Sequence, residues 1–175
     1  MGREKALVDF EGQPLILRVA ERMARAADPV FLASATPGRL GLLDYAEVPD
    51  IAANCGPLGG LVAGLEASPH DLMAVAAVDM PYLSPELMKF LASLRQEEDA
   101  VVPVGTTGLE PLHAVYAISA IPAMRRALAE GRYGLRRLLE GLRVREVPSS
   151  EWSHRGVDPG FAFNINTPAD LDVRA

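Results

Sequence analysis

An aspartate follows the most apolar segment of the chain, in a position that favours metal or phosphate chemistry. Residues 72–78 (L-M-A-V-A-A-V) form an uncharged run typical of a strand covered on both faces, and Asp79 comes directly after it. In α/β sheets, ligands bind at the carboxyl ends of the strands. A carboxylate there can bind Mg²⁺, which takes one or two carboxylates together with substrate phosphates. The alternative is a turn aspartate that accepts hydrogen bonds from backbone amides.

Two of the three asparagines of the chain stand close together near its carboxyl end. Asn164 and Asn166 are two residues apart, at the end of an expected short strand over residues 161–165, so their side chains would lie on one face of it. Such a pair can hydrogen-bond a substrate or complete the surroundings of a metal ion. The alternative is an ordinary turn followed by a helix cap, which Thr167 could supply alone.

A glycine-rich segment, residues 54–61 (N-C-G-P-L-G-G-L), precedes the apolar run and leads into an expected helix. Gly56, Gly59 and Gly60 would let the backbone approach a flat or phosphorylated ligand at the helix amino terminus. Close packing of this helix on the sheet is the alternative. Lys5, which follows a glycine near the start of the chain, either neutralises a phosphate or is an exposed terminal lysine.

The remaining candidates carry weaker signals. The three histidines are too scattered for a metal triad, and His113 has an apolar context typical of a semi-buried side chain. Cys55 is expected to pack in the interior. The sequence contains no G-x-S-x-G motif and no nucleophile with an obvious base, which disfavours covalent catalysis. A local group of arginines forms either a solvated helix face or a binding site for an anionic substrate. Its members are Arg125, Arg126, Arg132, Arg136 and Arg137.

Helical and strand-like apolar periods alternate along the chain and would position these residues. Helices are expected over residues 14–27, 58–67, 84–94 and 121–131, with a short one over 135–139 and a last one capped by Thr167. Strands are expected over residues 29–35, 45–48, 72–78, 100–104, 112–118, 142–147 and 161–165, with a polar loop over 149–160. This alternation predicts a three-layer α/β domain, Rossmann-like, with a mostly parallel sheet.

The composition bounds the class of protein. A chain of 175 residues makes one domain. Its net charge of −6 gives no general positive field, so a nonspecific nucleic-acid partner is not expected. Its longest uncharged run, residues 51–65, is too short and too rich in glycine to span a membrane. One cysteine permits no intrachain disulfide, and the first residues lack an apolar leader, so we expect a cytoplasmic protein.

The motifs, taken in order, resemble the molybdenum cofactor guanylyltransferase family of nucleotidyltransferases. The start of the chain looks like that family's R-M-G-x-x-K-A-L stretch followed by G-x-P-L, and the resemblance covers essentially the whole chain. Each motif alone is weak, whereas the ordered set is fairly specific. The segments that carry it are residues 1–7 (M-G-R-E-K-A-L), 12–15 (G-Q-P-L), 56–61 (G-P-L-G-G-L), 78–83 (V-D-M-P-Y-L), 110–114 (E-P-L-H-A) and 164–168 (N-I-N-T-P).

The resemblance implies a reaction and its partners. GMP from GTP would be joined to the molybdenum-bearing molybdopterin, with release of pyrophosphate and with Mg²⁺ as cofactor. The molybdopterin phosphate would attack the α-phosphorus directly, so no protein nucleophile is needed. GTP and molybdopterin would be the substrates, and other molybdenum-cofactor proteins are conceivable partners. The alternatives are a cytidylyltransferase acting on the same cofactor and a non-catalytic protein that holds the nucleotide or the pterin.

The resemblance also implies roles for individual residues. Lys5 would hold the GTP phosphates, and Asp79 would bind the Mg²⁺ that bridges the triphosphate. Asn164 and Asn166 would lie at the reacting centre beside the molybdopterin phosphate. Three residues would line the nucleotide pocket, with the acidic one accepting hydrogen bonds from the N–H edge of guanine: Asp50, Gly56 and Gly60.

The sequence departs from the family pattern at its start. Family members carry a strand and a glycine-rich L-A-G-G-x-S-x-R loop ahead of the Met-Gly pair, whereas this sequence begins with Met1. That part normally supplies a central strand, much of the guanine pocket and a catalytic arginine. The resemblance thus implies a single nucleotidyltransferase domain over residues 1–175 without its first strand and loop. Either the protein starts further upstream, or the sequence lacks residues, or the chain is an inactive copy; the intact downstream motifs favour the first two.

Overall fold

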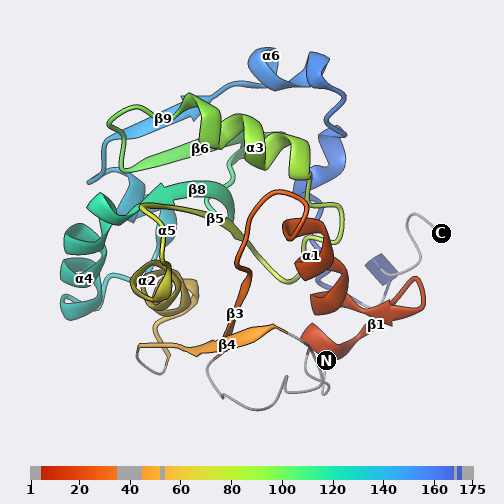
Figure 1. Cartoon of the computed structure of the whole chain (residues 1–175), viewed down its shortest axis with the longest axis horizontal. Helices are drawn as coiled ribbons and strands as arrows, with labels where there is room; N and C mark the ends of the chain where they lie inside the picture. The colour runs from red at the N-terminus through yellow and green to blue at the C-terminus, as the bar shows by residue number, and fades with distance from the viewer. Residues whose placement is uncertain (1–4, 35–44, 52–53, 168, 171–175) are drawn as a thin grey trace.

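A mixed β-sheet forms the centre of the computed structural model, which describes residues 5–34, 45–51, 54–167 and 169–170 (Figure 1). The sheet places β8 between β5 and β6, and it adds β7 and β9 on β6. Its strands are β5 (Leu72–Ala76), β6 (Ala100–Gly105), β7 (Gly108–Leu109), β8 (His113–Ala117) and β9 (Val144–Val147). β8 is antiparallel to both β5 and β6, whereas β9 is parallel to β6. β5, β6 and β9 therefore run in one direction and β8 runs against them.

The expected mostly parallel sheet is therefore a mixed one. Only residues 106–112, which include most of the β7 hairpin, connect β6 to β8. A parallel connection needs a dozen or more residues, so a link this short forces β8 to return antiparallel beside β6. The run of apolar residues over 112–118 predicts the strand itself but carries no information on its direction.

A second, smaller sheet stands apart from the first. It consists of β3 (Phe31–Ser34) and β4 (Ala46–Pro49), which pair in parallel. Near the start of the chain, β1 (Asp9–Phe10) and β2 (Gln13–Pro14) form an antiparallel hairpin. Within the described ranges, no strand pairing joins β3 to β5.

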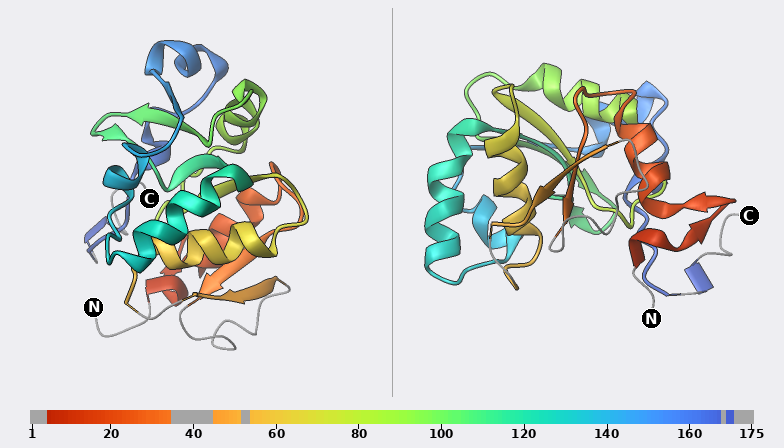
Figure 2. Two further views of the ribbon diagram at one scale, coloured as in Figure 1. Left: turned by 90° about the vertical axis from the view of Figure 1, so that its left-hand side faces the viewer. Right: turned by 60° about the horizontal axis from the view of Figure 1, so that its bottom comes forward.

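Helices cover both faces of the central sheet (Figure 2). One face packs against α2 (Pro57–Ala67), α4 (Ile121–Ala129) and α5 (Leu135–Leu139), and the other against α3 (Pro85–Leu94) and α6 (Ser149–Trp152). The remaining helix, α1 (Leu15–Met23), packs on β3 and on α3. Among the described residues, no helix is long and apolar enough to cross a membrane. The four longer helices expected from the sequence are confirmed; three are shorter than expected, and α2 begins one residue earlier.

The pleat of β6 distributes its side chains between the two cores. Val102 is buried among residues of α2, α4 and α5, whereas its neighbour Val101 is buried against α3. Successive side chains of a strand point to opposite faces, and both faces of this one are covered, so its sequence is a continuous apolar run. The amino terminus of α3 is fixed by Ser84, whose Oγ accepts a hydrogen bond from the Leu87 amide at 3.1 Å.

The carboxyl-terminal segment differs from expectation. The expected loop over 149–160 contains α6 and two 3₁₀ turns, η3 (Ser153–Arg155) and the start of η4 (Pro159–Ala162). The expected strand over 161–165 is wrong, because Asp158 accepts a hydrogen bond from the Gly160 amide at 2.7 Å and winds the chain into η4. The expected last helix lies largely outside the described residues; within them, the Asp170 carboxylate accepts hydrogen bonds from the amides of Asn166 and Thr167.

Candidate functional site

Three predicted residues from distant parts of the chain meet at the end of β5. The Lys5 ammonium, in the short 3₁₀ helix η1 (Lys5–Leu7), donates to Asp79 Oδ2 at 2.7 Å and to Asn166 Oδ1 at 2.9 Å. The side chains of Lys5 and Asp79 are 30% and 23% exposed, so both are accessible to a small ligand. The structure thus brings together one cation, one carboxylate and one carboxamide where the most apolar strand stops.

A buried residue between the two asparagines anchors them beside Asp79. The Ile165 amide donates to the backbone carbonyl of Asp79 at 2.9 Å, and the Ile165 side chain is fully buried against Phe10 and Leu15. Asn164 and Asn166 flank this anchor. The Nδ2 of Asn164 donates to the carbonyl of Ala162 at 3.0 Å, which fixes the orientation of that carboxamide. The backbone hydrogen bond between Ile165 and Asp79 therefore holds the two asparagines in place, a role that was expected of a strand over 161–165.

The surroundings of Asp79 fit a divalent cation. Its Oδ1 is buried and has no hydrogen-bond partner among the described residues, which is costly unless a ligand satisfies it. The described residues contain no group of three or more His, Cys, Asp or Glu side chains that could hold a metal alone. Mg²⁺ is commonly bound by one or two carboxylates and completed by substrate phosphates and water. Asp79 would be the protein ligand of such a site.

A cavity of about 480 Å³ adjoins this cluster. Asp50, Gly56, Gly60 and Asp79 all line it, so the structure brings the expected nucleotide-pocket residues to one space. At Gly60, an added Cβ would lie 2.9 Å from the Ala33 Cβ and 3.0 Å from Asp50 Oδ1, so only glycine fits there. Gly56 precedes α2 with φ +60° and ψ −157°, a backbone conformation that glycine adopts without strain.

Asp50 is held at the rim of the cavity by the smaller sheet. Its amide donates to the carbonyl of Ser34 at 3.1 Å, directly after the last paired residues of β3 and β4. Burial raises the pKa of the Asp50 carboxyl above its ordinary value. A partly desolvated carboxylate beside a helix amino terminus can accept hydrogen bonds from the N–H groups of a flat ligand.

Comparison with known proteins places this chain in a family. Residues 1–147 match the model of the MobA-like NTP transferase domain. The chain belongs to this family. The molybdenum cofactor guanylyltransferase of Desulfosudis oleivorans is 32% identical over 98% of this chain and 85% of the relative. A probable molybdenum cofactor guanylyltransferase of Pelotomaculum thermopropionicum is 32% identical over 98% of this chain and 83% of the relative.

The fold agrees with that of solved MobA-like proteins. The crystal structure of molybdopterin-guanine dinucleotide biosynthesis protein A from Archaeoglobus fulgidus matches with a TM-score of 0.83 and 28% identity, over 98% of this chain and 88% of that one. A cytidylyltransferase from Thermus thermophilus, at 20% identity and a TM-score of 0.68, shares the fold. The chain is therefore an α/β nucleotidyltransferase in fold and in family.

The weaker candidates of the sequence are buried or form ion pairs in this MobA-like domain. His113 is wholly buried rather than semi-buried, because β8 is an interior strand, and its ring lies 4.5 Å from that of Phe161. Within the basic group, Arg125 pairs with Glu66 at 2.6 Å and Arg132 pairs with Glu130. These ion pairs favour a solvated helix face for the group. Cys55 is buried, as expected of a packing residue.

Sequence reasoning missed two features of the candidate site. The only sequence signal that Ile165 is an anchor is that it is an apolar residue between two asparagines. The extension of the cavity along β3 and β5 has no signal in any single segment, because it arises from how two separate sheets face each other.

Proposed function

We propose that this single nucleotidyltransferase domain transfers GMP from GTP to the phosphate of molybdopterin, in the presence of Mg²⁺. The observation that carries the proposal is the cluster of Lys5, Asp79 and Asn166 at a cavity that also holds Asp50. The names of the relatives in Desulfosudis and Pelotomaculum supply the substrate class. A cytoplasmic location stays a prediction of the composition.

The cluster supplies what a direct phosphoryl transfer needs. A molybdopterin phosphate oxygen forms a bond to the α-phosphorus of GTP, the bond to the β-phosphate breaks, and pyrophosphate leaves with the electron pair. No covalent protein intermediate is required, so positioning and charge stabilisation are the whole task. When bound, Mg²⁺ would neutralise charge on the triphosphate, and Asp79 Oδ1 is the oxygen available to hold it.

The other side chains have separate parts in this proposal. Lys5 would leave its ion pair with Asp79 and neutralise phosphate charge, since an ammonium is a compact cation with three donors. Asn164 and Asn166 would orient the acceptor phosphate through their carboxamides, because Ile165 holds both beside Asp79. The cavity beyond Gly56 and Gly60 would receive the guanosine.

The assay that tests the proposal offers GTP and CTP together to the purified chain, with molybdopterin and Mg²⁺. We expect pyrophosphate release and a guanylylated pterin product, with GTP used at least about tenfold better than CTP. A clear preference for CTP would mean a cytidylyltransferase instead. Tight nucleotide binding without pyrophosphate release, in every variant of the chain tested, would mean a carrier protein.

Asp50 should decide which base is used. We expect Asp50→Asn to lower kcat/KM for GTP by roughly ten- to a hundredfold, because a carboxylate accepts two N–H groups of guanine whereas the amide presents one acceptor and one donor. The rate with ATP should change little. Asp71→Asn, an exposed aspartate just before β5, is the matched control and should leave both rates unchanged. An equal loss for both nucleotides would show that Asp50 does not contact the base.

A further inference from the structure

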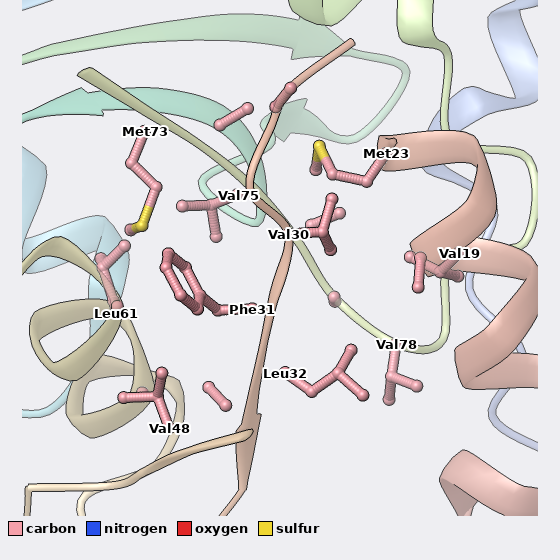
Figure 3. Close-up of a pocket in the computed structure, with 18 of the residues that line it drawn as sticks. Val19, Met23, Val30, Phe31, Leu32, Val48, Leu61, Met73, Val75 and Val78 are labelled. Atoms are coloured by element: carbon pink, nitrogen blue, oxygen red, sulfur yellow. The ribbon is translucent and has the colours of Figure 1, made fainter. Parts of the chain in front are cut away.

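A turn follows Asp79, and α1 packs against the end of it. The chain bends over residues 80–83, where the Leu83 amide donates to the Met80 carbonyl at 3.1 Å. Leu83 is fully buried and packs with Val19 and Met23 of α1. The same two side chains of α1 line the cavity (Figure 3). α1 therefore borders both the cavity and the turn that follows the candidate metal ligand.

Two arginines of α1 donate hydrogen bonds to carbonyl groups of this turn. Arg18 Nε donates to the Pro81 carbonyl at 3.3 Å. Arg22 Nε donates to the Leu83 carbonyl at 2.6 Å. The two arginines are four residues apart and lie on one face of the helix, where like charges repel. Burial, and then the charge of Arg18, lowers the pKa of Arg22, so the bonds to the turn offset an unfavourable placement of two cations.

Arg18 also contacts the β1–β2 hairpin. Its Nη1 pairs with Glu11 Oε2 at 2.7 Å, and its guanidinium lies 5.2 Å from the centre of the Phe10 ring. Glu11 has a φ of +54°, a left-handed conformation that glycine adopts more readily than glutamate. A carboxylate at this strained position is explained by its ion pair with Arg18, whose side chain is only 19% exposed.

Aromatic rings join the hairpin and the turn to the segment that carries the asparagines. The Tyr82 ring lies 5.9 Å from the Phe10 ring, nearly perpendicular to it, and 6.1 Å from the Phe163 ring. Phe163 directly precedes Asn164 in the chain. Arg18 thus contacts the hairpin and the turn, and both of these pack against the asparagine segment.

The backbone of Lys5 is attached to the same helix. The Val8 amide donates to the Lys5 carbonyl at 3.3 Å, and the Leu15 amide, at the start of α1, donates to the Val8 carbonyl at 2.9 Å. Arg18 follows about one helical turn later. One rigid helix therefore holds the lysine segment at its first residue and, through Arg18, the turn after Asp79.

We propose that Arg18 is a positioning residue, whose guanidinium holds the turn after Asp79 on α1 and thereby keeps the Asp79 carboxylate against the Lys5 ammonium. Its consequence for the rate rests on the proposed function. Arg18 does not line the cavity, so it acts through the residues that do. A misplacement of about 1 Å at a reacting centre can lower a rate by about a hundredfold. The planar guanidinium reaches Glu11 with one nitrogen and the Pro81 carbonyl with another, which a lysine ammonium cannot reproduce.

The test uses the two lysines of the chain, Lys5 and Lys89. Lys89 is exposed on α3 and serves as the internal reference for acetylation at low conversion, followed by mass spectrometry. In the parent, Lys5 should react more slowly than Lys89, because its ammonium makes two hydrogen bonds. Arg18→Met should raise the Lys5 rate by at least about threefold and leave the Lys89 rate unchanged.

Steady-state kinetics with GTP measure the effect on the reaction. Arg18→Met should lower kcat by about tenfold and change KM for GTP by less than about twofold, because the cavity for the guanosine is untouched. Arg25→Met is the matched control, since Arg25 is an exposed arginine just beyond α1. It should change neither kcat nor the labelling of Lys5.

A conservative variant separates the bridge from the charge. Arg18→Lys should melt close to the parent, yet its Lys5 rate and kcat should approach those of Arg18→Met; it decides the question if Arg18→Met does not fold. Parental values of both quantities in Arg18→Lys, or an unchanged Lys5 rate in Arg18→Met, would overturn the proposal. An equal rise of the Lys5 rate in Arg25→Met would do the same. If the parent does not use GTP, the proposed reaction fails, whereas faster labelling of Lys5 alone in Arg18→Met still supports the positioning role.

Discussion

Asp79→Ala should lower the rate of GMP transfer by about a thousandfold, the largest effect that we expect of any substitution in the chain. Its Oδ1 is buried without a hydrogen-bond partner among the described residues, while Oδ2 holds Lys5 at 2.7 Å. Alanine removes both the carboxylate that follows β5 and the partner that orients Lys5. Asp79→Asn should lose less, because it retains one oxygen, but it should still lose most of the rate.

A metal readout separates this role from a structural one. Mn²⁺ in place of Mg²⁺ can be followed by its paramagnetic resonance in the presence of GTP. We expect Asp79→Ala to weaken formation of the ternary complex by at least about tenfold while its melting curve stays close to that of the parent. Asp71→Ala removes an exposed carboxylate from the opposite end of the same strand and should change neither quantity. Normal turnover and normal Mn²⁺ binding by Asp79→Ala would refute the metal assignment.

The cluster could be predicted because its members follow local patterns. A run of seven apolar residues is typical of a strand covered on both faces, so it predicts that Asp79, the first charged residue after the run, lies just beyond a strand end. The spacing of Asn164 and Asn166 indicated that both serve one place. The contact that holds the two asparagines there differs from the expected strand. The backbone amide of Ile165 donates to the Asp79 carbonyl, although residues 163–165 form no strand.

The direction of β8 could not be predicted, because it depends on a pairing between distant segments. Hydrophobic periodicity identifies a strand over 112–118 equally well for either direction. The continuous apolar runs of β3 and β5 correctly indicate strands. The expected cover on both faces is not seen, because β5 is only partly buried along its length and Ala33 of β3 is exposed. The structure shows that β3 and β5 face each other across a cavity and do not pair with each other. The number of apolar residues in each strand cannot predict this arrangement.

His113 should make the protein markedly less stable as the pH falls below neutrality. Burial, with a smaller contribution from the charge of Arg22, lowers the pKa of His113 from 6.5 to about 3. The folded protein keeps the imidazole neutral, whereas the unfolded chain takes up a proton below pH 6.5. The stabilisation is therefore complete above pH 6.5 and is lost progressively as the pH falls towards 3. At about pH 5 the loss is about 2 kcal/mol.

Substitution of His113 by leucine tests this directly. Neither ring nitrogen has a hydrogen-bond partner among the described residues, so His113→Leu should be at least as stable as the parent at pH 7.5. Urea unfolding at pH 7.5, 6.5, 5.5 and 5 should show the variant gaining about 2 kcal/mol on the parent across the series. Asp99 does not interfere, because hydrogen bonds from Arg143 and Ser119 outweigh the effect of burial and lower its pKa to about 2. His154→Leu, at an exposed position, is the control and should leave the pH dependence of the free energy of unfolding unchanged. If the free energies of unfolding of His113→Leu and of the parent change with pH in parallel, the protonated imidazole has a hydrogen-bond acceptor in the core. β8 would then be less tightly enclosed than the structure shows.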